Sequence, residues 1–515
     1  MTEAARRLST FRLLAVCFST ASLLFASQIA ASADPANRFY SHWQRSDAVA
    51  LAAVVLLATA AAFGLARLVQ SRGGPVARRI LRWLFVLVLA DAALGFVVRL
   101  EDKPATWLRW GVPAVALAAV AAALYLAERK TWRLAVNAAL LFSPLGLILL
   151  GQLLLAPPVD VRPLVRTAEA AAPAGTPRPP IVLVIFDDWS WFRSSRDGAF
   201  LGSLPNLRAL SATSFLFTEA RSPGPHTVES IPELIAESQP PRLAALPDHA
   251  WWVGDGPTAA RAPEPRLFTE ASRAGYVPRL IGFYLPYREL VGEAVPEVRS
   301  EPHVPKGESL PAKMAFAVAR SMEAMGEPVS RRVGRWFDER AYNRHWYVMN
   351  TRIRERAMES LAELEPGTFL LVHFGLPHAP FVFSAEGAYQ PDSVVERMEG
   401  SLPKYHEHIR YVDRLTGEMV AVLRERGMFD EAMLVIMSDH NWVSEPDRRL
   451  REQRTVVPLL IKWPGQREGA TVSTRTCLVG LQALLGRVES GALAGMPADV
   501  PSAAVMDSLA RESCA

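Results

Sequence analysis

The chain contains very little cysteine, with only Cys17, Cys477 and Cys514 among its 515 residues. Cysteines this sparse and widely spaced exclude a disulfide framework and a cysteine-ligated zinc site. A single Cys477–Cys514 bridge in an oxidising compartment and two unpaired thiols both agree with the spacing. Neither sign of charge dominates, because 56 Lys and Arg stand against 52 Asp and Glu, for a formal net charge of +4. That small excess gives no indication of a nucleic acid partner.

Hydrophobic residues make up 50% of the chain, which is unusual for a wholly soluble protein. They gather in the first third, in five apolar stretches that each have about the 20 residues needed to cross a bilayer as a helix. Alternate connecting segments are rich in Arg and Lys, and by the positive-inside rule these segments are cytoplasmic. Five spans from a cytoplasmic N-terminus would place every later residue outside the membrane. The predicted spans are Phe11–Ala31, Ala48–Val69, Ile80–Val98, Leu108–Leu126 and Ala135–Leu155.

The first apolar stretch also has the features of a cleavable signal peptide. Arg6 and Arg7 precede the apolar run, and the small residues Ala31-Ser32-Ala33 follow it. Cleavage would remove one span and leave the later topology unchanged, since the new terminus would already lie outside. We favour retention of this segment as an anchor helix.

The sequence divides into four parts. Residues 1–155 form the predicted five-helix transmembrane domain, and the Pro- and Ala-rich residues 156–180 form an extended linker. Residues 181–487 alternate strand-like and helix-like segments, which predicts an α/β domain with a mostly parallel sheet and flanking helices. Residues 488–515 are predicted to be a poorly ordered tail.

Three continuous apolar runs in the α/β domain end in residues that bind metals. A run without polar alternation predicts a strand that is buried on both faces. Ligands gather beyond the carboxyl ends of such strands, and carboxylates and imidazoles are suitable zinc ligands. Each residue alone has a structural explanation, in a turn or a hydrogen-bonded core position, but their coincidence predicts a shared metal site. The runs are IVLVIF (Ile181–Phe186), followed by Asp187 and Asp188; FLLVHF (Phe369–Phe374), which contains His373 and precedes His378; and MLVIM (Met433–Met437), followed by Asp439 and His440.

Four segments occur in an order that resembles the sulfatase-like branch of the alkaline phosphatase superfamily: IVLVIFDD, SLPNLRALSATSFLFTEARSPGPHT, HFGLPHAPF and YVDRLTGEMVAVLRERGMFDEAMLVIMSDH. The resemblance spans nearly all of residues 181–487. A helical anchor with an external catalytic domain resembles the lipoteichoic acid synthases and phosphoethanolamine transferases of that branch. The resemblance implies a divalent metal, with zinc expected and manganese as the alternative. It implies Asp187, Asp188, Asp439, His440 and the nucleophile Thr227 as metal ligands, and we expect His226, His373 and His378 on the substrate side.

Thr227 lies in the Pro- and Gly-rich loop RSPGPHT, just before a capping-box pattern that runs from Ser230 to Glu233. The pattern predicts that a helix begins nearby, where its amides and dipole favour an anion. A divalent cation would activate the threonine hydroxyl as a nucleophile. Because the sulfatase signature C-x-P-S-R is absent, phosphoryl transfer is favoured over sulfate ester hydrolysis. The alternative is a threonine that serves only as a cap or turn residue.

The chain departs from the family pattern around His440. Asn441 and Trp442 stand where a glycine and an acidic residue are usual, and no histidine follows His440. We therefore expect one firmly built metal site and leave a second site open. Two functions follow: a membrane-embedded transferase or hydrolase acting on phospho-substituents of envelope lipids or glycans, with sulfuric ester hydrolysis as its variant, or a degenerate relative that binds an envelope partner without turnover.

Two helical regions complete the prediction. The segment Ser330–Glu363 interleaves Arg with Trp and Tyr, which is typical of a solvated amphipathic helix pair. In a tethered domain the same pattern would suit anionic headgroups or a phosphorylated substrate. The segment Tyr405–Arg426 is predicted to be a packing helix, with an apolar face made by Ile409, Val412, Leu415, Met419 and Leu423.

Overall fold

The computed structural model describes residues 9–33, 38, 41–99, 106–156, 158, 164–165, 178–236, 252–253, 259–260, 265–304, 306–307, 309–324, 329–390, 401–481, 502 and 506. The chain forms two compact units. One comprises residues 1–38, 43–158 and 305–341, and the other comprises residues 39–42, 159–304 and 342–515. Most of the predicted linker and of the predicted tail lies outside the described residues.

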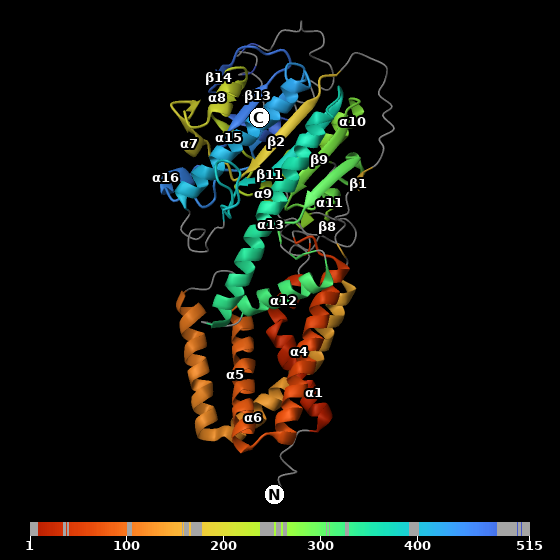
Figure 1. Ribbon diagram of the computed structural model, residues 1–515, viewed down its shortest axis with the longest axis vertical. Helices are drawn as coiled ribbons and strands as arrows, with labels where there is room; N and C mark the ends of the chain where they lie inside the picture. The colour runs from red at the N-terminus through yellow and green to blue at the C-terminus, as the bar shows by residue number, and fades with distance from the viewer. Residues whose placement is uncertain are drawn as a thin grey trace. The chain divides into compact units, whose positions relative to one another are not determined.

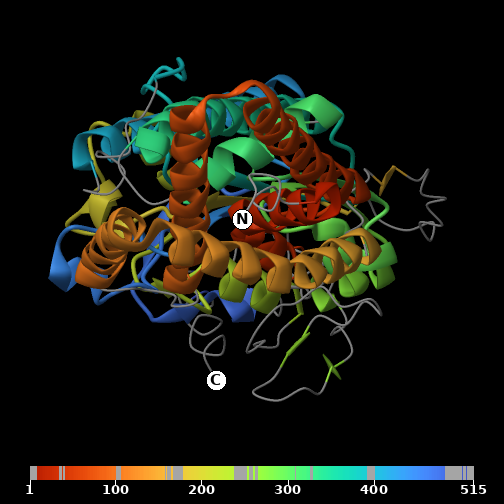
Figure 2. The ribbon, with the colours of Figure 1, turned by 90° about the horizontal axis from the view of Figure 1, so that it is seen from below.

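The first unit is helical (Figures 1 and 2). Two of its described segments, Arg45–Arg72 and Val115–Leu155, are long and apolar enough to cross a membrane. Five separate spans are not seen among the described residues, because the predicted first span is interrupted at Phe25 and the last two lie in one long helix. That long helix loses helical geometry at Ala127, where φ is −142° and ψ is 44°. The helices are α1 (Thr10–Leu24), α2 (Ala26–Ala33), α4 (Arg45–Arg72), α5 (Pro75–Arg99), α6 (Thr106–Leu155) and α12 (Leu310–Ala324).

The second unit is built on a nine-stranded sheet in the order β1-β10-β9-β11-β2-β12-β13-β5-β14 (Figure 1). Strands β10, β9, β11, β2 and β12 run parallel to one another, whereas β13 is antiparallel to both β12 and β5. This mostly parallel sheet confirms the predicted α/β class. Its strands are β1 (Leu164–Val165), β2 (Ile181–Asp187), β5 (Phe215–Phe217), β9 (Val277–Phe283), β10 (Glu297–Glu301), β11 (Thr368–Pro377), β12 (Met433–Ser438), β13 (Leu459–Lys462) and β14 (Ala470–Val472).

Helices cover both faces of this sheet. Alternate residues of β2 enter two different cores: Val182, Val184 and Phe186 lie in one, and Ile181, Leu183 and Ile185 lie in the other. The first core is completed by α8 (Pro205–Ser211), α13 (Val329–Ala362) and α15 (Leu402–Glu425). The second core is completed by α9 (Thr227–Ala236), α10 (Arg266–Arg273) and α11 (Tyr287–Val291). The absence of polar alternation in the three apolar runs is thereby explained.

Helices α15 and α13 compare differently with the prediction. The predicted apolar face of α15 is confirmed, because all five of its named residues are buried. The expected helix pair at 330–363 is wrong, since α13 is one helix of 34 residues. No Gly or Pro interrupts the chain between Arg335 and Ala362, so that nothing in this stretch favours a turn.

Short elements surround the sheet. Three two-stranded pairs are β3 (Ser195–Arg196) with β4 (Ala199–Phe200), β6 (Ala220–Arg221) with β15 (Thr476–Cys477), and β7 (Trp252–Val253) with β8 (Ala259–Ala260). The remaining short helices are α7 (Trp191–Ser194) and α16 (Arg448–Arg451), with 3-10 turns at Gly292–Ala294 and Leu478–Gly480.

Candidate metal centre

The three strands that were expected to converge are neighbours in the sheet. Strand β2 lies between β11 and β12 and runs parallel to both. Asp187 is the last residue of β2, and Asp439 and His440 directly follow β12. Parallel neighbours end at the same edge of a sheet, which places these side chains together at its carboxyl end.

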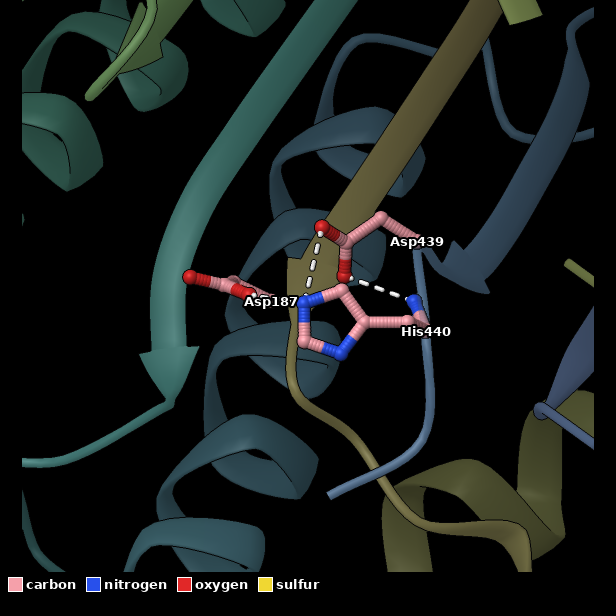
Figure 3. A group of neighbouring side chains, drawn as sticks. All are labelled: Asp187, Asp439 and His440. Carbon is pink, nitrogen blue, oxygen red and sulfur yellow. Dashed lines mark hydrogen bonds and ion pairs between the residues drawn. The ribbon is translucent and has the colours of Figure 1, made fainter. Parts of the chain in front are cut away.

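Asp187, Asp439 and His440 form one buried group whose ligand atoms all lie within 4.8 Å of one another. Figure 3 shows the three side chains turned toward a common point at the end of β2. His440 Nε2 lies 3.2 Å from Asp187 Oδ1 and 3.6 Å from Asp439 Oδ2. Two carboxylates and an imidazole at this spacing match the donor set that zinc and manganese accept.

The hydrogen bonds of the group leave lone pairs directed at its centre. His440 Nδ1 donates to the carbonyl of Asn441 at 3.0 Å, so that in the neutral ring the lone pair is on Nε2. Asp439 Oδ1 accepts from the backbone amide of His440 at 2.8 Å. Asp439 Oδ2 is buried and has no hydrogen-bond partner in the described part of the chain. A cation held by Asp187, Asp439 and His440 would satisfy these atoms, so the residues fit a divalent metal.

The pKa values show how strongly positive charge is favoured here. Burial lowers the pKa of His440, but the carboxylates, Asp439 first, raise it well above the ordinary value. Burial raises the pKa of Asp187, but the histidines around it, His378 first, bring it down to about 2. Asp439 is dominated by burial, which raises its pKa to about 6. The centre is thus a dense acidic site that binds protons or cations.

The side chain of Asp188 makes different contacts from that of Asp187. Its Oδ1 accepts from the backbone amide of Val443 at 2.6 Å and lies 3.5 Å from His440 Nδ1. This is the ring nitrogen that is hydrogen-bonded to the carbonyl of Asn441. Its backbone has a positive φ of 68°, a conformation that Asp tolerates better than most residues. Burial raises its pKa to about 7. The structure therefore places Asp188 behind the imidazole and outside the group of three ligand atoms.

Thr227 is the first residue of α9 and is buried against the group. Its Oγ1 donates to Asp187 Oδ1 at 3.2 Å and lies 3.2 Å from His440 Nε2. The predicted capping role of Ser230 is wrong, because the helix begins three residues earlier, where the carbonyl of His226 accepts from the amides of Glu229 and Ser230. The hydroxyl of Ser230 instead donates to the carbonyl of Asp439 at 2.5 Å and joins α9 to the ligand loop.

The histidines expected on the substrate side lie at different depths. His373 is fully buried, and its Nε2 lies 4.0 Å from Asp439 Oδ2. His378 is partly exposed, with its ring 5.4 Å from that of Trp346. Burial lowers the pKa of His378, but Asp187 and Asp188 more than offset this and raise it. His226 is partly exposed, and its ring lies 6.1 Å from that of His440.

Several supporting residues were not found from the sequence. Tyr287 Oη lies 2.6 Å from His373 Nδ1 and fixes that ring from α11. Ser438 Oγ donates to the carbonyl of His440 at 2.7 Å, and Tyr405 Oη donates to the carbonyl of Asp188 at 2.8 Å. Tyr287 and Tyr405 come from helices far along the chain, and no local pattern marks them. Ser438, next to Asp439, was the one that its position could have indicated.

Comparison with known proteins identifies the region that carries this centre. Residues 179–479 match the family described as Sulfatase, and this segment contains Asp187, Thr227, Asp439 and His440. No curated protein matches the chain. Among solved structures, Ps i-CgsB is 18% identical, with 64% of this chain and 74% of that chain covered and a TM-score of 0.40. The phosphonate monoester hydrolase of Agrobacterium radiobacter is 15% identical, with 60% of this chain and 74% of that chain covered and a TM-score of 0.38. A putative sulfatase from Bacteroides thetaiotaomicron is 14% identical, with 64% of this chain and 75% of that chain covered and a TM-score of 0.43.

Proposed function

Because the chain belongs to the sulfatase family, we propose that it is a membrane-anchored, metal-dependent enzyme that transfers or hydrolyses phospho-substituents of envelope lipids or glycans through Thr227. The observation that carries this proposal is the position of the threonine hydroxyl. Its oxygen lies 3.2 Å from both Asp187 Oδ1 and His440 Nε2, inside the group that fits a metal. A threonine that only capped a helix would not need this burial among ligand atoms.

The reaction uses few groups of the chain. A divalent cation, which Asp187, Asp439 and His440 would hold, would supply Lewis acidity that lowers the pKa of a nearby hydroxyl and offsets charge on a phosphoryl oxygen. Thr227 Oγ1 forms a bond to phosphorus as the bond to the leaving group breaks. The hydroxyl proton passes to solvent, and the leaving group departs with the bonding electron pair and takes up a proton. An acceptor hydroxyl or water then attacks the same phosphorus and releases Thr227. His378, whose raised pKa favours the charged form, donates to a substrate oxygen.

Phosphoryl transfer is favoured over sulfate ester hydrolysis by the residues around the nucleophile. The chain reads Thr227-Val228-Glu229-Ser230-Ile231, without the cysteine that sulfatases modify or the arginine that follows it. Ser230 is already committed to the carbonyl of Asp439. The hydroxyl of Thr227 is therefore the nucleophile that the chain offers.

The membrane anchor is proposed to have five spans, with the catalytic unit outside the inner membrane. Helices α1 and α2 together would supply one pass, α4 and α5 would supply one each, and the non-helical Ala127 would divide α6 into two more. The basic residues Arg72, Arg78, Arg79 and Arg82 lie at the α4–α5 connection, which favours a cytoplasmic position for that end. Cys477 forms a disulfide, as suits an oxidising compartment beyond the membrane.

Three substitutions test the proposal in the purified full chain. Substrates would be p-nitrophenyl esters of phosphate, phenylphosphonate and sulfate, which separate the reaction classes. Thr227→Ala should abolish turnover of the phosphorus esters with metal content unchanged, and Thr227→Ser should retain a reduced rate through its own hydroxyl. Thr213→Ala is the matched control, since its hydroxyl bonds to the carbonyl of Leu210, outside the centre.

Mass spectrometry of the peptide that contains Thr227 completes the test. Wild type quenched during turnover should carry a phospho-adduct on this peptide, and Thr227→Ala should carry none. Near wild-type turnover by Thr227→Ala would rule out the covalent route. Faster turnover of the sulfate ester than of either phosphorus ester would reverse the choice of substrate class.

A further inference from the structure

An arginine-rich segment follows the ligand loop in the chain. Residues 445–454 have the sequence EPDRRLREQR, with four arginines and three acids. Each acid already has a partner: Glu445 with Arg193, Asp447 with the backbone amide of Arg449, and Glu452 with Arg448. Arg451 donates to two backbone carbonyls. This leaves the exposed Arg449 and Arg454 with no side-chain partner among the residues that the structure describes.

The backbone around Arg454 bridges the ligand loop and the nucleophile loop. On one side, the amide of Asn441 donates to the carbonyl of Arg454 at 3.1 Å, and Asn441 Nδ2 donates to the carbonyl of Gln453 at 3.2 Å. On the other side, the amide of Ser222, in the loop RSPGPHT, donates to the carbonyl of Thr455 at 2.8 Å. A glycine at position 441 could not form the side-chain bond. Residues 453–455 are therefore fixed between the two loops that carry the ligands and the nucleophile.

The charge of Arg454 is felt at His226, the residue before the nucleophile. Burial lowers the pKa of His226, Glu229 raises it, and the positive charges of His440 and Arg454 lower it further. The ring of His226 is partly exposed and lies 6.1 Å from that of His440. Solvent screens an exposed charge over short distances, so an effect of this kind comes from a neighbour. The guanidinium of Arg454 thus stands beside His226, at the solvent side of the metal centre.

We propose that Arg454 binds a second anionic group of the substrate, a carboxylate or phosphate outside the reacting ester. The inference rests on the phospho-substrate proposed above and narrows it to substrates with two anionic groups. The first group is held at the metal centre next to Thr227, and the second reaches the guanidinium past His226. An arginine without a carboxylate partner is available to a ligand, and its planar fork donates two parallel hydrogen bonds to a carboxylate or phosphate.

Binding is measured by isothermal titration calorimetry on the purified full chain in a neutral detergent. The probes are ω-carboxyalkylphosphonates with two to five methylene groups and the corresponding ω-amides, which are not turned over and differ by one charge. Wild type should bind the best carboxylate about fivefold more tightly than its amide, as an exposed ion pair allows. Arg454→Gln should bind the two alike. Arg454→Lys should keep part of the difference, because it retains the charge without the planar fork.

Arg449→Gln is the matched control. Arg449 is also an exposed arginine of residues 445–454 without a side-chain partner in the described part of the chain, but it lies outside the bridge at 453–455. This variant should keep the wild-type difference between carboxylate and amide. Equal binding of the two probes by wild type, or an Arg454→Gln variant that keeps the difference, would overturn the proposal.

The same measurements separate this inference from the catalytic proposal. Turnover by Thr227→Ala near the wild-type rate, with the carboxylate preference intact, would remove the covalent mechanism and leave the role of Arg454 standing. Failure of wild type to bind any of the phosphonates would instead count against the phospho-substrate on which both depend.

Discussion

The two oxygens of Asp439 have different surroundings in the candidate metal centre. Oδ1 accepts from the amides of His440 at 2.8 Å and Asp188 at 3.2 Å, and so fixes the turn after β12. Oδ2 points toward His440 Nε2 and is left for a cation. One side chain therefore both stabilises the turn, through Oδ1, and offers a metal ligand, through Oδ2. A neutral replacement should keep the first role and weaken the second.

We predict that Asp439→Asn keeps the fold and loses the metal. An amide oxygen can still accept from the two backbone amides, but the site loses a negative charge. Metal affinity should fall by more than the roughly 10–100-fold that follows loss of a partner to a ligand. Elemental analysis by plasma mass spectrometry checks this. Asp413→Asn is the control, since Asp413 is a buried acid that accepts from Asn206 and Leu207 on α8. A variant with wild-type metal content would contradict the shared site.

His378→Ala should behave in the opposite way and lower turnover while the metal is retained. The residue is partly exposed, packs against Trp346 and lies outside the three-ligand group. Loss of one donor to a transition-state oxygen typically costs about 10²–10³-fold in kcat. Ester turnover and metal content measured on one preparation separate the two effects. His406→Ala should match wild type in both, and joint loss of metal and turnover in His378→Ala would place His378 among the ligands.

At the scale of single residues, the candidate metal ligands could be predicted from the sequence better than the residues that hydrogen-bond to the site. Asp187, Asp439 and His440 could be predicted to meet because each follows a strand, and neighbouring parallel strands end together. The hydrogen bonds that orient them could not be predicted. Tyr287 reaches His373 from α11, and the role of Ser230 depends on where α9 begins. Such pairings follow from tertiary structure and leave no local pattern.

At the scale of elements, the loop after β11 is fastened to α15 by His408. Its Nε2 accepts from the amide of Phe383 at 3.0 Å, and its Nδ1 lies 3.2 Å from the carbonyl of Pro377. The loop between these points carries His378. Burial lowers the pKa of His408 to about 3, so the ring stays neutral in the folded protein. The helix thereby positions a residue of the proposed substrate side.

This depressed pKa predicts loss of stability in acid. The unfolded state takes up a proton near pH 6.5 and the folded state only near pH 3, so stability is full above pH 6.5 and falls below it. His408 alone should lower the free energy of unfolding by about 2 kcal/mol between pH 6.5 and pH 4.5. Urea unfolding followed by tryptophan fluorescence should show a flatter pH profile for His408→Gln. His406→Gln should follow wild type, and parallel profiles for His408→Gln and wild type would refute the assignment.

Elements themselves were predictable to different degrees. Long strands such as β2 and β12 could be predicted because their apolar runs are continuous, and α15 because its apolar positions repeat with helical spacing. The order of the sheet could not be predicted, since β5 and β13 have three and four residues and their antiparallel pairing joins distant parts of the chain. The single helix α13 was missed although its core residues Trp346, Met349, Ile353, Ala357 and Leu361 repeat with helical spacing.

At the scale of the whole molecule, the chain combines a helical unit with a catalytic unit of different composition. Apolar side chains stay exposed on the helical unit, including Leu126 at 81% and Leu141 at 78%. Exposed apolar surface of this kind marks contact with a membrane or with another protein, and the proposed membrane anchor would account for it. The number of separate helices in the helical unit was the least predictable feature. The length of an apolar stretch alone does not reveal the break at Phe25 or the bend at Ala127.

The proposed five spans predict that the C-terminal end lies outside the cytoplasm. Four arginines between positions 72 and 82 hold the α4–α5 connection inside, and three further passes then separate it from the catalytic unit. A reporter that is active only in the cytoplasm should give no signal when fused after Ala515, and a reporter active only outside should give one. The control is a fusion after Gly74, in the α4–α5 connection, where the cytoplasmic reporter should be active. A strong cytoplasmic signal from the Ala515 fusion, with the Gly74 control unchanged, would mean that an even number of passes lies between the two points, and the disulfide at Cys477 would then stand in a reducing compartment.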